Sequence, residues 1–434
     1  MIFIFIILCM MIGGCKEGNF FDIQSTMRPP KITGIESDIK NTVQQYTGID
    51  VIWKYPRRGD YKSSIVLCDI NGDGNDEAVV FYGLEEEKSG IYMMILHNVN
   101  GSWQVVNKFY NECYGIDKII FEDLKGNNGK QLLVGYRLPD KVKNHLQIYD
   151  YDGNEYKELN NGYIYNDFSI RDFNKDAVNE LMILATDLEN YKTSCQLIKF
   201  HDDTIGVIDS LEIKREIIRY ENMTSGKLND SYEGIFLDYR KSDGSIETEV
   251  FFVDKEENKL KCMFTSNYTK RDIPLFCESI TEDNIISIPI QVDMKLESDS
   301  KSSGTYMIEW SKFNKDLSKM YCEKESICNY NIGYNLFIPN NWKGRIEYEI
   351  GENLMHQIFN EICQDENGNV THKNILELIK LNRNEWQSIE DKSKYTLIMQ
   401  QNEFYYIAEI PDTESELFVS KDYIINNFSL LDSN

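Results

Sequence analysis

The sequence contains none of the short motifs that mark the commonest catalytic centres. It has no G-x-S-x-G, H-E-x-x-H, Walker A or G-x-G-x-x-G pattern. Its five histidines are scattered, and no Cys-x-x-Cys pair or Cys/His cluster has the spacing of a zinc site. These absences disfavour the nucleophile, phosphate-loop and zinc classes of enzyme. An acidic active site stays open, because carboxylate pairs are too abundant for one to be singled out.

Basic residues and long hydrophobic runs are also scarce. The 46 Lys and Arg residues face 71 Asp and Glu residues, which gives a net charge of −25. This balance disfavours nucleic acids and anionic membrane surfaces as direct partners. Beyond the N-terminus no stretch approaches the roughly 18 apolar residues of a membrane span. The 434 residues, 41% hydrophobic and 12% aromatic, suffice for one large folded domain or two to three ordinary ones.

The N-terminal residues predict export and a lipid anchor. Residues 2–12 are apolar, which is the length of a signal-peptide core and too short to span a bilayer. Gly13 and Gly14 then precede Cys15, and small residues before a cysteine resemble the bacterial lipobox. That resemblance implies a signal peptide over residues 1–14 and a diacylglycerol on Cys15. The mature chain would then be anchored at the outer face of the bacterial cytoplasmic membrane, with residues 15–47 as a tether and short N-terminal segment.

The sequence leaves two points open, which are the role of the N-terminal residues and the pairing of the cysteines. No Lys or Arg precedes the apolar run, so a plain secretory signal or a buried segment remains the other interpretation. Export also permits disulfides among the ten cysteines. Apart from Cys9 and Cys15 in the N-terminal segment, Cys322 and Cys328 are the one close pair, and the sequence leaves their bridge undecided.

The run CDINGDGNDEAVVF at residues 68–81 concentrates oxygen ligands in a short loop. Gly72 and Gly74 let the backbone curl, and calcium prefers several oxygen ligands. An EF-hand is excluded, because its twelfth position, here Val80, falls in a strand. The sequence therefore predicts a structural calcium site, with a metal-free acidic turn as the alternative. The predicted ligands, at loop positions 1, 3, 5, 7 and 9, are Asp69, Asn71, Asp73, Asn75 through its carbonyl, and Glu77.

The same loop, followed by an apolar strand, recurs along the chain. Its first position falls at residues 69, 123, 172, 225 and 279, so successive copies are 54, 49, 53 and 54 residues apart. A period near 50 is typical of a propeller blade of about four short strands. The second copy has Lys125 at a ligand position, and we expect no metal there or in the fourth and fifth copies. The third copy predicts a second possible site, formed by Asp172, Asn174, Asp176, Val178 through its carbonyl, and Glu180.

On these residues, above all DINGDGNDEAVVF, the chain resembles the FG-GAP or VCBS repeats of integrin-like β-propellers. Together with the lipobox it is similar to VCBS-containing lipoproteins of low-GC Gram-positive bacteria. The resemblance implies a mainly β fold with a calcium-binding propeller over residues 48–329, five copies being detected and six or seven blades left open. Residues 330–434 are expected to form a small α+β region that stands alone or completes the propeller. It should end in an amphipathic helix with a stripe of Leu417, Tyr423, Ile424 and Phe428.

Two functional hypotheses follow. The first is a non-catalytic binding, adhesion or accessory module on the cell surface, held by the lipid and stabilised by calcium, for an unknown protein or carbohydrate. The second is an extracytoplasmic hydrolase or lyase with an acidic site on the propeller face, since the fold alone does not decide activity. Paired carboxylates of raised pKa in a central pocket favour the enzyme, and a neutral or apolar lining favours the binding module.

Overall fold

The computed structural model describes residues 34–431, apart from residues 86, 88, 139–143, 160–161, 202–203, 264–267, 293–303 and 412. The signal peptide and Cys15 lie outside the described residues, so the anchor stays a prediction. No helix in the described part of the chain is long and apolar enough to cross a membrane. The chain divides into two compact units. Unit 1 runs to Glu122 and adds Gly129–Lys141 and Gln147–Glu158, and unit 2 comprises Asp123–Asn128, Val142–Leu146 and Leu159–Asn434.

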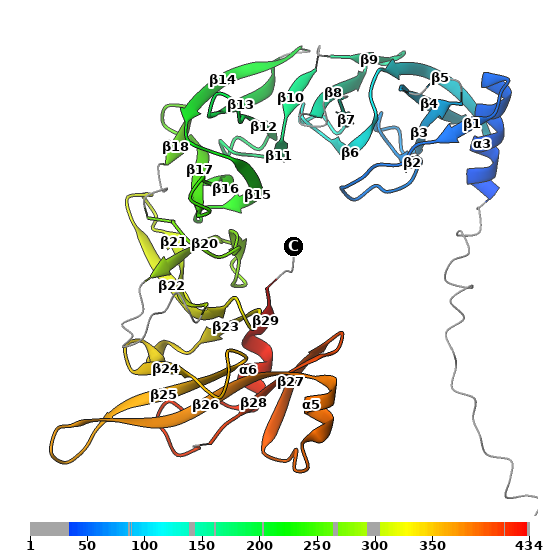
Figure 1. Ribbon diagram of the computed structural model, residues 1–434. Helices are drawn as coiled ribbons and strands as arrows, with labels where there is room; N and C mark the ends of the chain where they lie inside the picture. The colour runs from blue at the N-terminus through cyan, green and yellow to red at the C-terminus, as the bar shows by residue number, and fades with distance from the viewer. Residues whose placement is uncertain are drawn as a thin grey trace, which may run out of the picture. The chain divides into compact units, whose positions relative to one another are not determined.

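The structure is mainly β, as predicted, and consists of antiparallel sheets in which most neighbouring strands are consecutive in the chain (Figure 1). The first sheet contains β1 (Val51–Trp53), β2 (Ile65–Cys68), β3 (Glu77–Leu84), β4 (Ile91–Val99) and β5 (Ser102–Asn111). The second contains β6 (Gly115–Glu122), β7 (Gln131–Arg137), β8 (Asn144–Tyr151), β9 (Tyr156–Glu158) and β10 (Tyr163–Tyr165). The division between the two units falls within this second sheet.

Three further sheets repeat this pattern in unit 2. The third contains β11 (Asp167–Arg171), β12 (Glu180–Asp187), β13 (Lys192–His201) and β14 (Thr204–Lys214). The fourth contains β15 (Arg219–Lys227), β16 (Glu233–Arg240), β17 (Ile246–Asp254) and β18 (Lys259–Met263). The fifth contains β19 (Glu278–Ser279), β20 (Ile286–Val292), β21 (Thr305–Phe313), β22 (Met320–Asn329), β23 (Tyr334–Ile338) and β29 (Phe428–Leu430).

The predicted period of about 50 residues coincides with these sheets. Each of the five register positions lies at, or a few residues before, the hairpin that opens its own sheet. The strand after each hairpin is apolar and buried on both faces, because sheets pack against one another within each unit. Val79 of β3 shares one core with Leu132 of β7, and Met182 of β12 shares another with Ile235 of β16. Burying one such side chain contributes roughly 1.5–3 kcal/mol.

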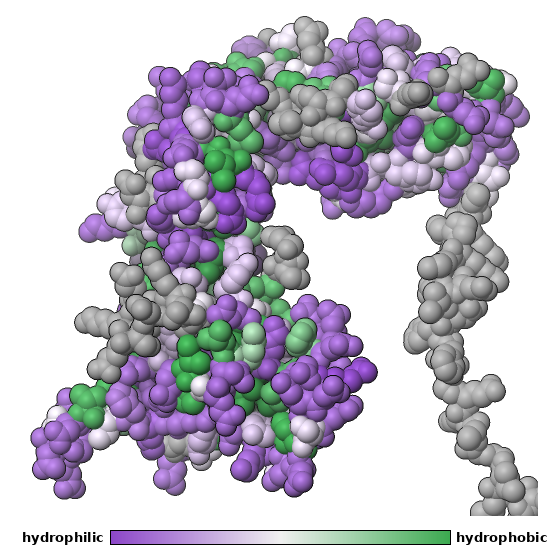
Figure 2. All heavy atoms as spheres, viewed as in Figure 1, coloured by the Kyte–Doolittle hydropathy of each residue, from purple (hydrophilic) through white to green (hydrophobic). Residues whose placement is uncertain are grey.

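The N-terminal helix was not expected from the sequence. Helix α3 (Gly34–Thr47) takes up the end of the segment predicted as a tether. Ile39 and Val43, four residues apart and hence on one helix face, are fully buried in a core that also contains Val80 and Tyr82 of β3. On the face shown in Figure 2, hydrophilic side chains cover most of the surface, as the acidic composition predicts.

The C-terminal region is a small α+β structure, as predicted. Its sheet has the strand order β24-β25-β26-β28-β27. The region also contains short helical segments. The elements are η1 (Asn340–Trp342), β24 (Ile346–Ile350), β25 (His356–Gln364), β26 (Val370–Asn382), α5 (Arg383–Ser388), β27 (Tyr395–Gln401), β28 (Phe404–Glu409) and α6 (Lys421–Asn427). The boundary expected after residue 329 falls between β22 and β23, which pair with each other.

The predicted terminal amphipathic helix is wrong in extent. Helix α6 begins after Ser420, whose hydroxyl oxygen accepts the Tyr423 N–H at 3.1 Å. After Asn427 the chain becomes strand β29, and Phe428 pairs with Leu336 of β23. This pairing satisfies backbone groups at a sheet edge that would otherwise be exposed.

A disulfide between Cys322 and Cys328 is excluded by their positions. Both lie on β22 and both are free thiols. Six residues of extended strand separate them by about 20 Å. A disulfide requires Cα atoms within about 7 Å of each other.

Candidate functional site

The loop between β2 and β3 holds the predicted metal ligands in one turn, although its three carboxylates do not all approach within 4.8 Å of one another. Asp69 accepts the backbone N–H groups of Gly72 at 2.8 Å and Gly74 at 3.0 Å. Asp73 accepts the backbone N–H of Asn75 at 2.8 Å and its side-chain amide at 3.0 Å. Gly72 and Gly74 have φ angles of 78° and 88°, which only glycine adopts readily. The loop curls because these two residues allow it.

Glu77 closes the loop from the first position of β3. Its side chain is 2% exposed, and one carboxylate oxygen accepts the Ile70 N–H at 2.9 Å. The Asn71 amide nitrogen lies 3.1 Å from Asp73 and 3.2 Å from Glu77, so it bridges two carboxylates. Burial raises the pKa of Glu77, although the backbone N–H groups of Ile70 and Asn71 oppose that rise. Turning the Asn71 amide over would direct its oxygen toward the same point.

This loop has no cationic side chain of its own. Within the described part of the chain, no Lys or Arg pairs with Asp69, Asp73 or Glu77 at ion-pair distance. His97 of β4 lies one residue beyond the Ala78–Leu96 pair, toward Glu77. Its Nε2 lies 3.2 Å from the Tyr156 hydroxyl, and burial lowers the pKa of His97. The donor set is therefore acidic, rich in oxygen, and fits a hard cation such as calcium.

The hairpin between β11 and β12 has nearly the same backbone hydrogen bonds. Asp172 accepts the Asp176 N–H at 2.9 Å, and the Asn174 amide nitrogen lies 3.1 Å from Asp176. Val178 donates its N–H to Asp176 at 3.0 Å. Carboxylate oxygens of Asp172, Asp176 and Glu180 lie within 4.8 Å of one another. The structure thus brings together the three carboxylates of the second predicted set.

Two non-glycine residues replace the glycines of the first loop. Lys175 and Ala177 have φ angles of 64° and 69°, at the positions of Gly72 and Gly74. A side chain in this left-handed region costs roughly 1–2 kcal/mol. The backbone at Ala177 is therefore strained.

The third loop, which is the hairpin between β11 and β12, also contains a cation that sequence reasoning missed. The ammonium of Lys199, from β13, lies 2.6 Å from Glu180 Oε1 and also bonds Asp176. Burial alone would lower the pKa of Lys199, but the two carboxylates raise it, so the side chain is charged. Lys199 is 19 residues from Glu180. Only the β12–β13 register brings them together.

The remaining loops differ from the first in their charges. In the second loop Asp123 accepts the Gly126 N–H at 2.7 Å, and the Lys125 ammonium lies over the Phe200 ring instead of in the loop. In the fourth, Arg171 and Lys175 pair with Glu233. These contacts are consistent with the expectation of no metal there, which stays a prediction.

A separate cavity of about 360 Å³ lies within unit 2. Its polar lining includes Asn222, Glu278 and Ser429, and Asn335 lies among them with its side chain 3% exposed. The side-chain oxygen of Asn335 is buried and has no hydrogen-bond partner among the described residues. The full lining is Asn222, Pro274, Leu275, Phe276, Cys277, Glu278, Asn335, Ser429, Leu430 and Leu431.

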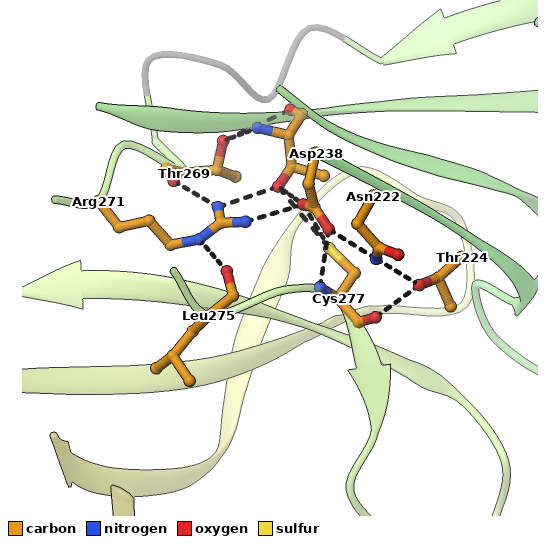
Figure 3. A network of polar contacts seen from close by, with 8 residues as sticks. Asn222, Thr224, Asp238, Thr269, Arg271, Leu275 and Cys277 are labelled. Atoms are coloured by element: carbon orange, nitrogen blue, oxygen red, sulfur yellow. Dashed lines mark hydrogen bonds and ion pairs between the residues drawn. The ribbon is translucent and has the colours of Figure 1, made fainter. Parts of the chain in front are cut away.

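A buried polar network holds two of these lining residues in place (Figure 3). Asp238 accepts the Cys277 N–H at 3.0 Å and the Asn222 amide at 3.2 Å. Arg271 compensates the charge of Asp238 at 2.8 Å, and both side chains are fully buried. Burial, followed by the nearby Asp238, raises the pKa of Cys277 well above its usual range. Cys277 is therefore a protonated thiol and a poor nucleophile.

Comparison with known proteins gives a likeness of fold and nothing finer. No protein-family model matches the chain, and no curated protein matches it. The Dos1 propeller is 10% identical with a TM-score of 0.29, covering 63% of this chain and 66% of that one. AofleA from Arthrobotrys oligospora is 11% identical with a TM-score of 0.25, covering 64% and 71%. The exotype rhamnogalacturonan lyase YesX is 9% identical with a TM-score of 0.26, covering 74% of each. At these scores the three structures carry no argument about what this chain binds or does.

Proposed function

We propose that this protein is a non-catalytic, lipid-anchored binding module on the outer face of a bacterial cytoplasmic membrane. Its repeats are of the FG-GAP or VCBS type, and calcium in the loop of residues 69–77 stabilises them. Its ligand is a carbohydrate, bound in the cavity beside Asn222 and Asn335. The anchor rests on Cys15, and the calcium role rests on the acidic loop.

The observation that carries the ligand proposal is the unpartnered oxygen of Asn335. A buried acceptor without a donor is costly, and a ligand hydroxyl would supply that donor. Asn222 and Ser429 add further polar groups, while Leu275 and Leu430 supply apolar surface. Several polar groups converge on this cavity beside a smaller apolar surface, and convergent polar groups are typical of a small-molecule site. Sugars present both hydroxyls and apolar faces.

The cavity lining favours binding over hydrolysis. Glycoside hydrolysis usually needs two carboxylates on either side of the scissile bond. This cavity has one carboxylate, Glu278, among its lining residues. The buried thiol of Cys277 is not a competent nucleophile. We therefore place the hydrolase or lyase hypothesis second.

The calcium proposal rests on electrostatics. Asp69, Asp73 and Glu77 place three carboxylates in one turn without an ion pair in the described structure. A bound cation removes their mutual repulsion and stabilises the folded state by RT ln(1 + [L]/Kd). That is about 2.7 kcal/mol at a hundredfold excess over Kd.

A glycan array probed with the purified protein tests the ligand proposal. Wild-type protein should bind a defined set of glycans, and Asn335→Leu, which keeps the volume but removes the acceptor, should lose them. Asn154→Ala serves as the control, because Asn154 is exposed and does not line the cavity. Binding that persists in Asn335→Leu would place the ligand elsewhere, and turnover of any glycan would favour the enzyme.

A further inference from the structure

The third and fifth sheets each direct a lysine from their third strand into the loop of the opening hairpin. Lys199 of β13 stands one residue beyond the Leu181–Ile198 pair, opposite Glu180. Lys312 of β21 stands one residue beyond the Ile288–Ser311 pair. The two lysines therefore occupy equivalent positions in their sheets.

Both ammonium groups lie where a metal ion would lie in a loop of this kind. Lys199 Nζ lies 2.6 Å from Glu180 Oε1 and bonds Asp176, and its side chain is 18% exposed. Lys312 Nζ lies 2.6 Å from Thr281 Oγ1 and 2.7 Å from Asp283 Oδ2. Its side chain is fully buried.

The first sheet differs at this position. Here the residue one position beyond the Ala78–Leu96 pair is His97, whose ring faces Tyr156 and whose Nε2 bonds that hydroxyl at 3.2 Å. The His97 ring bonds the Tyr156 hydroxyl and not a carboxylate of the loop. The first loop therefore lacks the tethered cation that the third loop has, although the two share their backbone hydrogen bonds.

We propose that Lys199 is a built-in substitute for the metal ion, so that the loop of residues 172–180 folds without calcium. The calcium expected there from the sequence does not fit, because the lysine ammonium already bonds two of the carboxylates that would hold it. A divalent cation beside a fixed ammonium would also be repelled at short range. Lys312 has the same role in the fifth sheet. The contrast with the first loop rests on the proposed calcium site there, but the statement about Lys199 does not.

Calcium stoichiometry of the whole protein provides the first test. Titration calorimetry with calcium chloride should give one calcium per wild-type chain and none for Asp73→Asn, which disables the first loop. A second equivalent that survives in Asp73→Asn would overturn the proposal, and this measurement needs no change at Lys199. If wild type binds no calcium, the first-loop site fails while the role of Lys199 stands.

Removing the lysine provides the second test. In the Asp73→Asn background, Lys199→Met keeps the length of the side chain but leaves Asp172, Asp176 and Glu180 without a counter-ion. This variant should gain one calcium site, with a Kd of about 10⁻⁴–10⁻³ M, and should melt higher in calcium than in chelator. Lys199→Arg, which keeps the charge, should gain none. If Lys199→Met melts identically in calcium and chelator, the ammonium does not stand in for a metal.

Discussion

Arg271 Nη2 lies 2.8 Å from Asp238 Oδ1, and both side chains are fully buried. The carboxylate is also bonded by Thr248 at 2.6 Å and by the Cys277 N–H at 3.0 Å. A buried charge is tolerated only when it is paired and hydrogen-bonded, and this one is both. The pair joins the fourth sheet to the segment that lines the cavity.

Arg271→Met should destabilise the protein strongly, because it removes the counter-ion of the buried Asp238 carboxylate. We expect a loss of about 3–5 kcal/mol in the free energy of unfolding. Lys261→Met is the matched control, since its ion pair with Glu257 is exposed and should contribute under about 1 kcal/mol. Urea unfolding followed by circular dichroism measures both. A loss at Arg271 as small as that at Lys261 would contradict the structure of this network.

Calcium should raise the melting temperature through the loop of residues 69–77. Asp73→Ala should remove most of the difference between calcium and chelator, because Asp73 is one of the three carboxylates of the loop and shares the Asn71 amide with Glu77. Asp123→Ala, in the loop where Lys125 replaces a ligand, should leave that difference intact. Differential scanning fluorimetry, with millimolar calcium and with chelator, measures this difference in melting temperature. Identical wild-type melting curves in both buffers would mean that this loop is only an acidic turn.

Ala177→Gly should stabilise the protein by about 1 kcal/mol, since the φ angle of Ala177 is 69° and glycine adopts it without strain. The reciprocal change tests the same principle in the first loop. Gly74→Ala should lower the free energy of unfolding by a similar amount, because a φ of 88° is strained for alanine. The added Cβ would meet no atom within 4 Å, so backbone strain alone accounts for this loss. Chemical denaturation gives both values. The free energy of unfolding should rise in Ala177→Gly and fall in Gly74→Ala. Changes of the same sign in both variants would show that the turn relaxes around the substituted residue.

Cys322 should react slowly with iodoacetamide near neutral pH. Burial raises the pKa of Cys322 to about 11, and Glu309 and Glu325 add to the rise. The thiolate is the reactive form, so a raised pKa shifts reactivity toward high pH. At pH 8 its rate should be about a hundredfold below that of a thiol with the ordinary pKa. Peptide mapping should show the rate still climbing above pH 9, whereas protein unfolded in urea should level off there.

Cys15→Ser should abolish lipid attachment. The variant should appear in the medium or keep its signal peptide, because the thiol that would carry the diacylglycerol is gone. Detergent phase separation of cell fractions, with sequencing of the N-terminus, measures the result. A variant that still partitions with the detergent and has a normally processed N-terminus would refute the anchor.

Local pattern was enough to predict the repeating sheets and the first loop. The run from Asp69 to Glu77 holds its ligands and glycines within nine residues, and the apolar residues of β3 follow at once. A turn of this kind is built from hydrogen bonds between near neighbours, so its residues predict it. Helix α5 carried a local signal too, the capping box of Asn382 and Glu385, which was overlooked.

Contacts between distant residues were decided by the tertiary structure. Lys199 reaches Glu180 only because the β12–β13 register places them opposite each other, and a shift of one residue would turn the lysine to the other face. Arg271 bonds Asp238 although 33 residues separate them in the sequence. The segment that begins at Phe428 forms strand β29 because it pairs with the edge strand β23. The sequence therefore determined which residues form an acidic turn. Packing and strand register determined which of those turns already contain a cation.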